Sequence, residues 1–353
     1  NNNKMKKYII GILISFISTA SIAQKEFIIK SEIPGIKDGI VVGLMTAEDS
    51  ENKEIAVDTV KNGKFTLRGK LNHPTLCTLT TNNLNLLGND QDTEKIRWTY
   101  TTIFVSNTNM TFAATAYDSI TNDAPIGRYF KITGGSPQAD FNEYNLSGIK
   151  PLDWIKNHPH SVLSVKLAND LIKGGSGLRK IEIQNIANLI STVPDDPNRL
   201  SEFRRNCEFA KRTAVGEPIL DLPLFDTKKT ANRLTNIIPK GRYTLIDFWA
   251  SWCGICRSSI PDIKSVAKKH PNITIVGVSA DSKYDQWINA VKKEKMEWKQ
   301  YCLTIDGGKQ LLEKYLITGV PFYIIVDPQG RIVRVPQYVS EIDDYFTQID
   351  NKK

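Results

Sequence analysis

The sequence predicts a C-terminal α/β domain, with a mixed sheet and helices on both faces, preceded by a small antiparallel β domain and a helical connector. Three patterns lead to this division. Short apolar runs between turn residues fill residues 24–136, apolar residues at helical spacing dominate residues 137–214, and strands alternate with helices over residues 215–353. At 353 residues, 41% of them hydrophobic, the chain is long enough to bury more than one core.

Residues 1–23 are predicted to be a secretory signal peptide. Three lysines in the first seven residues precede an apolar run from Tyr8 to Ile17, and small residues lead to an expected cleavage site after Ala23. A run of about 10 apolar residues is shorter than the about 20 that a spanning helix needs. The alternative is an uncleaved anchor. The mature protein is therefore expected in the periplasm, where disulfides persist.

Composition excludes several classes of protein. Glycine and proline, at 22 and 16 residues without a fixed period, exclude a collagen-like chain, and five cysteines are too few for a disulfide-stapled scaffold. Removal of the three signal-peptide lysines leaves 43 basic against 38 acidic residues, so the formal charge falls from +8 to +5. This charge is spread along the chain and is typical of a solvated surface, so no nucleic-acid partner is expected.

Residues 24–136 have the pattern of short strands joined by turns. Ile40–Met45 is one apolar run, and residues 57–68 contain two strands around Asn62-Gly63, a dipeptide typical of two-residue hairpin turns. Further β-rich runs cover residues 75–80, 98–105 and 110–117. These short strands predict an antiparallel sheet or sandwich.

The connector, residues 137–214, changes to helical spacing. Apolar residues from Ile181 to Ile190 form one stripe, prolines interrupt it, and a second helix is predicted over Leu200–Ala214. His158 and His160 flank a proline and are interpreted as a loop or a helix cap. No other His or Cys lies at ligand spacing from them, so no metal is expected.

Strands and helices alternate through residues 215–353. The predicted strands cover residues 243–249, 273–278, 322–326 and 331–335, and the predicted helices cover residues 256–269, 284–295, 309–316 and 341–349. This order implies a mixed sheet with both faces covered.

Cys253 and Cys256 are the candidate catalytic residues. They lie where a predicted strand ends and a helix begins, so free helix amides and the positive end of the helix dipole stabilise a thiolate on Cys253. Arg257 adds a positive charge nearby. Cys256 is within one helical turn and can displace a partner bound to Cys253, which predicts two-electron exchange with another protein.

Cys-x-x-Cys also occurs in zinc sites, haem attachment sites and structural hairpins. Zinc would need a second ligand pair, which the sequence lacks, and haem attachment needs a histidine where Arg257 stands. A purely structural disulfide across so short a loop would constrain little of the unfolded chain. The pattern therefore favours redox chemistry without a bound cofactor or metal.

The residues around the pair resemble the thioredoxin superfamily, specifically its exported TlpA/ResA-like branch, across residues 215–351. The matching residues are the run from Asp247 to Cys256 (DFWASWCGIC), Pro261, and Gly319-Val-Pro321 before a strand. The β-rich region resembles a domain of undefined function that often precedes such modules in Bacteroidota. That second resemblance brings no catalytic residues.

The resemblance implies roles for the two cysteines and for Asp247. Cys253 would be the exposed nucleophile, Cys256 the buried resolving thiol, and Asp247 a buried carboxylate that shuttles the resolving proton. An apolar strand raises the pKa of such a carboxylate toward that of a thiol. The alternative is a core aspartate bonded to neighbouring amides. Ser259 stands where many relatives carry a glutamate, which places more weight on Asp247.

The resemblance also implies a docking surface. Trp252 would cover the thiols, and Pro321 would be cis and expose the Val320 backbone to an extended substrate peptide. Gly254-Ile255 replaces the Gly-Pro that thioredoxin-like reductants commonly have, and together with Arg257 it tunes the reduction potential, so the direction of electron flow stays open.

The function predicted is a periplasmic thiol-disulfide oxidoreductase that reduces disulfides in exported proteins. The resemblance suggests cytochrome c apoproteins as one class of client and a membrane thiol donor of DsbD type. Two alternatives remain: a disulfide oxidase or isomerase, and an envelope-binding protein whose redox module is auxiliary. Cys77, Cys207 and Cys302 are expected to be buried thiols, with a bridge between the first two left open.

Overall fold

The structure is a computed structural model that describes residues 26–47, 53–88, 95–120, 130–173, 177–190, 197–317 and 319–351. The predicted signal peptide lies outside the described residues. The chain divides into two compact units, residues 1–138 and 139–353, which are considered separately below. Among the described residues, no helix has both the length and the apolar character needed to cross a bilayer.

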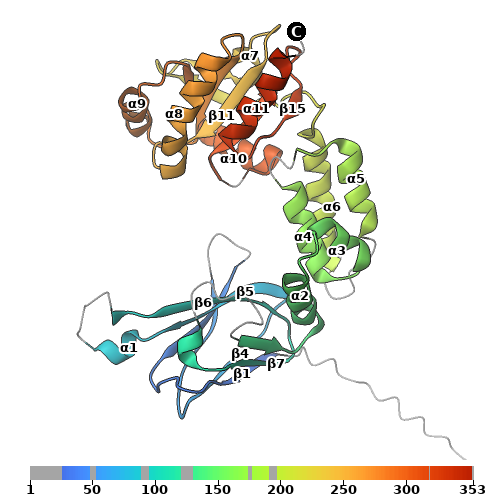
Figure 1. Cartoon of the computed structure of the whole chain (residues 1–353), viewed down its shortest axis with the longest axis vertical. Helices are drawn as coiled ribbons and strands as arrows, with labels where there is room; N and C mark the ends of the chain where they lie inside the picture. The colour runs from blue at the N-terminus through green and yellow to red at the C-terminus, as the bar shows by residue number, and fades with distance from the viewer. Residues whose placement is uncertain are drawn as a thin grey trace, which may run out of the picture. The chain divides into compact units, whose positions relative to one another are not determined.

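Two four-stranded sheets build the N-terminal unit (Figure 1). The first has the order β4 (Lys64–Gly69), β1 (Phe27–Glu32), β7 (Asn109–Ala114), β8 (Phe130–Thr133), and the second β3 (Glu54–Thr59), β2 (Val41–Thr46), β5 (Thr75–Asn82), β6 (Trp98–Val105). Short helical turns, α1 (Leu84–Leu87) and η2 (Tyr117–Ser119), follow β5 and β7. β1 and β7 pair in parallel, whereas the other strand pairs described in these sheets are antiparallel. The predicted antiparallel β domain is confirmed.

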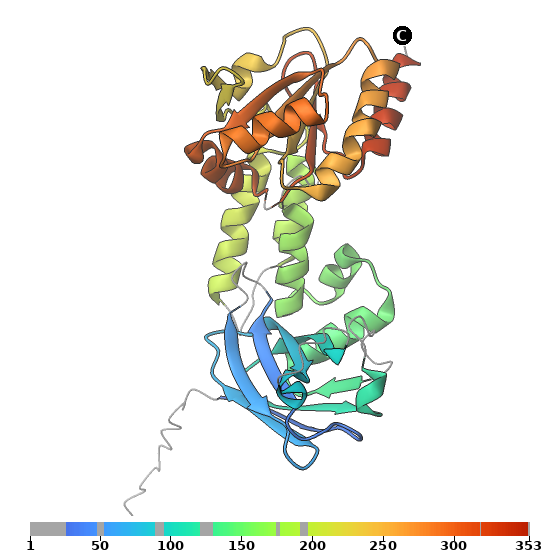
Figure 2. The same ribbon diagram turned by 90° about the vertical axis from the view of Figure 1, so that its left-hand side faces the viewer.

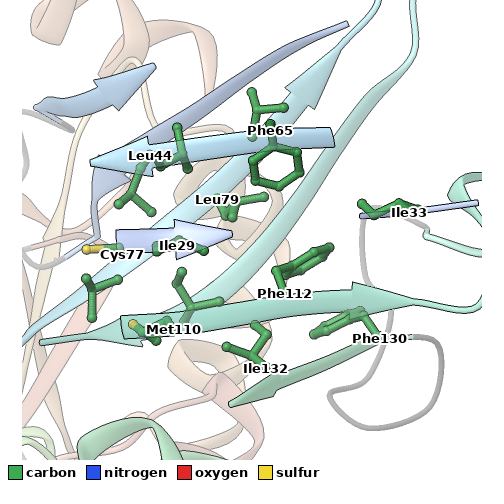
Figure 3. Packing of buried hydrophobic residues seen from close by; sticks show 14 of the residues in the cluster. Ile29, Ile33, Leu44, Phe65, Cys77, Leu79, Met110, Phe112, Phe130 and Ile132 are labelled. Carbon is green, nitrogen blue, oxygen red and sulfur yellow. The ribbon is translucent and has the colours of Figure 1, made fainter. Parts of the chain in front are cut away.

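The core of this unit forms from alternate residues of both sheets, as Figure 3 shows. Ile29 and Phe112 come from one sheet, and Leu44 and Leu79 from the other. Alternation arises because successive side chains of a strand point to opposite faces. Cys77 lies in the same core and is fully buried.

The predicted turn at Asn62-Gly63 is present, and both residues have positive φ, at 52° and 70°. Residues that accept positive φ are required at both central positions of this turn type. The Gly63 amide donates to the Asp38 carboxylate at 3.0 Å. After the turn the two strands separate: β3 pairs with β2, and β4 pairs with β1 of the other sheet.

Helices fill the first part of the second unit (Figures 1 and 2). They are α2 (Ser136–Ser147), which begins just before the unit, α3 (Pro151–Asn157), α4 (Val162–Ile172), α5 (Lys180–Leu189) and α6 (Pro197–Arg212). His158 is the C-cap of α3, and its ring stacks on Trp154 with ring centroids 3.8 Å apart. The interpretation of His158 as a loop or cap residue is confirmed.

A seven-stranded mixed sheet forms the rest of this unit. Its order is β10 (Ala231–Arg233), β9 (Pro223–Asp226), β13 (Lys299–Leu303), β12 (Thr274–Ser279), β11 (Thr244–Trp249), β14 (Phe322–Val326), β15 (Ile332–Arg334). Strands β11, β12 and β13 are parallel, and the flanking strands pair antiparallel.

Helices cover both faces of this sheet, as predicted. They are α7 (Leu234–Ile237), α8 (Gly254–Lys269), α9 (Tyr284–Lys293), α10 (Ile305–Tyr315) and α11 (Val339–Asp350). α8 and α11 lie side by side, orange and red in Figure 2, and pack on Leu245 of β11. α10 packs against Ile246 on the opposite face.

Two carboxylates of α11 hold the end of α8. His270, 3% exposed, lies 2.7 Å from Asp350 and 3.0 Å from Asp343. We expect His270→Ala to lower the free energy of unfolding by about 2 kcal/mol, because it removes two partly buried hydrogen bonds to carboxylates. Denaturant titration would measure this. Lys268→Ala, at an exposed site of the same helix, should change it by less than about 0.5 kcal/mol, and equal effects would contradict the assignment.

Candidate active site

The cysteine pair lies at the start of α8, just beyond the carboxyl end of β11. Cys253 is the N-cap of α8 and forms a disulfide with Cys256, their Cα atoms 5.3 Å apart. The backbone amide of Cys256 donates to the sulfur of Cys253 at 3.1 Å. An amide of the first helical turn thus already faces the sulfur that would carry the negative charge in the reduced form.

The expectation that Cys253 is exposed is wrong for this disulfide form. Cys253 is 7% exposed and Cys256 2%, because Cys253 packs in a cluster with Trp249 and Ala250. The difference between the two cysteines has the expected sign but is small. The exposed surface around the pair comes instead from its neighbours Trp252 and Ile255, which are 67% and 72% exposed.

Asp247 is buried on β11, and burial raises its pKa to about 7. Alternation along the strand directs its side chain to the same face as Leu245, which packs under α8. Burial alone accounts for this raised pKa, without a contribution from a hydrogen bond or a nearby charge of the described residues. The alternative of a core aspartate bonded to neighbouring amides is therefore not what the structure shows.

Two hydroxyl groups lie close to Asp247 and Cys256. Tyr323 of β14 is directly opposite Asp247 in the strand register. Its hydroxyl is 3.1 Å from that of Ser259, which donates to the carbonyl of Cys256 at 2.8 Å. Burial and then the charge of Asp247 raise the pKa of Tyr323 to about 12. Sequence reasoning treated Ser259 only as a missing glutamate and overlooked Tyr323, which sits in an apolar strand without a motif.

The chain before β14 approaches the pair from the other side. The peptide bond between Val320 and Pro321 is cis, as the resemblance implied. The carbonyl oxygen of Val320 is 3.5 Å from the sulfur of Cys253. The backbone of Val320 therefore lies beside the reactive sulfur, where an incoming peptide would have to pass.

Arg257 contributes less positive charge to the pair than its position in the sequence suggests. Its guanidinium donates through Nε to a carboxylate oxygen of Glu294 at 2.7 Å, and Nη2 is 2.5 Å from the same oxygen. The carboxylate offsets the charge of Arg257. Gly254 has open space where a Cβ would stand, so no close contact requires glycine at this position.

Asp281 is a buried residue of the site that sequence reasoning missed. Its carboxylate accepts hydrogen bonds from the amide and hydroxyl of Ser251, at 2.8 and 2.5 Å, and from the hydroxyl of Ser279 at 2.6 Å. Asp281 follows β12, and the carboxyl ends of the adjacent parallel strands β11 and β12 meet at this edge. It thereby holds the loop that leads into Cys253. A signal did exist, since Asp281 lies three residues after the predicted strand 273–278.

The comparison with protein families identifies the fold of this region. The family model described as thioredoxin-like matches residues 241–332. The chain contains a thioredoxin-like domain. A second model, for a domain of unknown function (DUF4369), matches residues 27–141, which corresponds to the β-rich region.

Relatives of the thioredoxin-like domain are thiol-disulfide oxidoreductases. ResA of Bacillus subtilis is 26% identical over 152 residues, or 41% of this chain and 82% of ResA. HelX of Rhodobacter capsulatus, a thiol:disulfide interchange protein, is 31% identical over 93 residues, or 26% of this chain and 51% of HelX. The chain thus spans between about half and four fifths of these relatives. The predicted enzyme class, thiol-disulfide oxidoreductase, is confirmed.

Part of the chain is also similar to solved structures. The crystal structure of the thioredoxin domain of a thiol-disulfide oxidoreductase from Bacteroides vulgatus is 31% identical, with a TM-score of 0.36. The match covers 38% of this chain and 97% of that domain.

The other three cysteines form no disulfide, although Cys302 lies in the same buried cluster as the reactive pair. Cys77, Cys207 and Cys302 are buried thiols, so the bridge left open between Cys77 and Cys207 is not formed. Burial raises the pKa of Cys207 and of Cys302 to about 11. Thiols that stay protonated are poor nucleophiles. Among the described residues, no group of three or more His, Cys, Asp or Glu side chains is arranged to hold a metal ion.

Proposed function

We propose that this protein is a periplasmic thiol-disulfide oxidoreductase that reduces disulfides in exported proteins through Cys253 and Cys256. The observation that carries the proposal is the disulfide at the start of α8, with a helix amide on the sulfur of Cys253 and a buried carboxyl group, Asp247, on the same side of the sheet. The predicted signal peptide supports the compartment.

The reaction proceeds by two exchanges. In the reduced protein, the thiolate of Cys253 attacks a client disulfide, forms a mixed disulfide and releases one client sulfur as a thiolate, which takes up a proton. Cys256 then loses its proton and attacks the sulfur of Cys253. The client leaves with two thiols and two more electrons, and the pair is left as the disulfide seen here.

Asp247 is proposed to accept the proton of Cys256. A carboxyl group with a pKa of about 7 is partly ionised at neutral pH, so it can take up a proton and later return it. Ser259 binds the carbonyl of Cys256 and contacts Tyr323. These two hydroxyl groups hold the start of α8 against the strand opposite Asp247.

Client binding is proposed to use main-chain contacts at Val320 and apolar contacts at Trp252. Exported proteins with cysteine pairs, apocytochromes c among them, would be the clients. Each turnover leaves the pair oxidised, so a membrane thiol donor of DsbD type would have to supply two electrons. These assignments rest on the resemblance to exported relatives and on the exposed indole of Trp252.

The reduction potential of the pair tests the direction of electron flow. For the mature chain equilibrated with glutathione buffers, we expect a value of about −270 mV, as for thioredoxin, together with reduction of insulin disulfides. Cys253→Ser should abolish insulin reduction. A potential of about −120 mV would favour the oxidase alternative. No insulin reduction by the reduced wild-type chain would contradict the proposal.

A further inference from the structure

A cavity of about 390 Å³ opens beside the redox pair and is not used by the chemistry described above. Its walls come from the residues next to the cysteines and from α9. Trp252 and Arg257 lie on the first side, and Gln286, Asn289 and Lys293 on the second. Trp252, which directly precedes Cys253, therefore lines the cavity and adjoins the reactive residue.

The α9 wall is rigidly tied to the pair. Gln286, Asn289 and Lys293 are spaced three and four residues apart, so they project from one face of the helix. The opposite face carries Trp287, which is fully buried in the same cluster as Cys253 and Cys256. Packing against this cluster fixes the distance between the polar face of α9 and the disulfide.

The cavity has an excess of positive charge and is lined in part by exposed amide side chains. The guanidinium of Arg257 is offset by Glu294. Lys293 has no ion-pair partner within the described residues, and the side-chain amides of Gln286 and Asn289 make no hydrogen bond there. One uncompensated ammonium group and two amide groups thus face a cavity partly walled by the Trp252 indole.

We propose that this cavity receives an acidic side chain of the client, close in sequence to the cysteine that Cys253 attacks. The inference rests on the proposed function and specifies its substrate class. A carboxylate would accept hydrogen bonds from both amides and pair with Lys293. A basic side chain would be repelled by Lys293, and an apolar one would gain neither the ion pair nor the hydrogen bonds.

Geometry limits which residue of the client can enter. The carbonyl of Val320 is beside the sulfur of Cys253. Trp252, the residue directly before Cys253, lines the cavity. An extended peptide advances about 3.3 Å per residue. An acidic residue two or three positions from the client cysteine, about 7–10 Å along the chain, is therefore expected to reach the cavity.

A peptide series tests this inference on the full mature chain. The substrates are disulfide-linked homodimers of a nine-residue peptide with a central cysteine and otherwise neutral residues, in which Glu or Gln is placed at each other position in turn. The rate constant for oxidation of the pre-reduced protein is measured. At one position on one side of the cysteine, Glu should give a rate about threefold to fivefold above Gln, the size expected for one partly screened ion pair.

Two lysines of α9 provide the matched comparison. Lys293→Gln should remove the preference for Glu over Gln. Lys292→Gln removes the same charge from the neighbouring residue, which does not line the cavity, and should keep the preference. Lys293→Glu should reverse the preference, so that a Lys-bearing peptide reacts faster than its Glu counterpart. The preference should weaken in about 1 M salt.

Three results would overturn the inference. They are equal rates for Glu and Gln peptides at every position, equal loss of preference in the two lysine variants, and a Glu preference that survives Lys293→Glu. In each of these cases, reduction of the neutral peptide by the wild-type chain still supports the proposed function. If the reduced wild-type chain reacts with no peptide, the proposed function itself is contradicted.

Discussion

Asp247→Asn is expected to raise the free energy of unfolding by about 4 kcal/mol at pH 8. Burial raises the pKa of Asp247 from 3.8 to about 7, and each pKa unit corresponds to about 1.4 kcal/mol. The pKa of Asp247 is higher in the folded state than in the unfolded state, so protonation of its carboxyl group stabilises the folded protein. This contribution is fully present below about pH 4 and is lost as pH rises through about 7. Asparagine keeps the shape of the side chain without this dependence.

Urea titrations of the disulfide form between pH 4 and pH 8 would measure the effect. The variant should gain stability over the wild type as pH rises and match it near pH 4. Asp262→Asn changes an exposed carboxylate on α8 and should have no comparable effect at any pH. A variant that is less stable than the wild type at pH 8 would show that the carboxylate of Asp247 has a stabilising partner.

The same Asp247→Asn change is expected to slow the release of client. Without an acceptor for the proton of Cys256, decay of the mixed disulfide should slow by about 100-fold, the lower range for general base catalysis. The first attack by Cys253 does not need this proton transfer and should change little. Rapid-mixing measurements with the pre-reduced protein separate the two steps. Equal loss of both rates, together with lower stability, would mean a folding defect instead.

Local composition predicts much of the fold but not every element. β6 and β14 have the predicted bounds because β-branched and aromatic residues fill them. The helix predicted over residues 309–316 begins earlier, at Ile305. Gly307 and Gly308 have low helix propensity and mask the start, whereas Thr304 caps it by accepting from the Gly307 amide at 2.9 Å.

The candidate active site likewise contains residues that the sequence predicts and contacts that it does not. The pair, Asp247 and Pro321 lie in local motifs and could be named from the sequence. The contacts of Ser251 with Asp281, of Arg257 with Glu294, and of Ser259 with Tyr323 join residues 30 to 64 positions apart. Strand register and helix packing create these contacts, and spacing along the chain does not encode them. The low exposure of Cys253 likewise follows from packing.

Cys256→Ser is expected to convert the protein into a trap for its clients. The sulfur of Cys253 keeps its helix amide and can still attack, but a serine hydroxyl cannot displace the captured client, so the mixed disulfide persists. Turnover with insulin should fall by about 10³-fold or more, as for loss of an essential catalytic group. Non-reducing electrophoresis of the variant after incubation with insulin should show a covalent adduct that dithiothreitol removes.

The cysteine whose sulfur forms that adduct is the nucleophile, and the other cysteine is the resolving thiol. Cys253→Ser should form no adduct, because Cys256 is 2% exposed and packs in a buried cluster with Trp249 and Trp287. Cys207→Ala removes a buried thiol of α6 whose pKa burial raises to about 11, and it should leave turnover normal. Adducts with Cys253→Ser but not with Cys256→Ser would reverse the roles of nucleophile and resolving thiol.

Since Cys253 is only 7% exposed in the disulfide form, capture also requires that the reduced sulfur become accessible beside Trp252. Alkylation of the reduced Cys256→Ser variant by iodoacetamide should therefore occur at Cys253 faster than at Cys302.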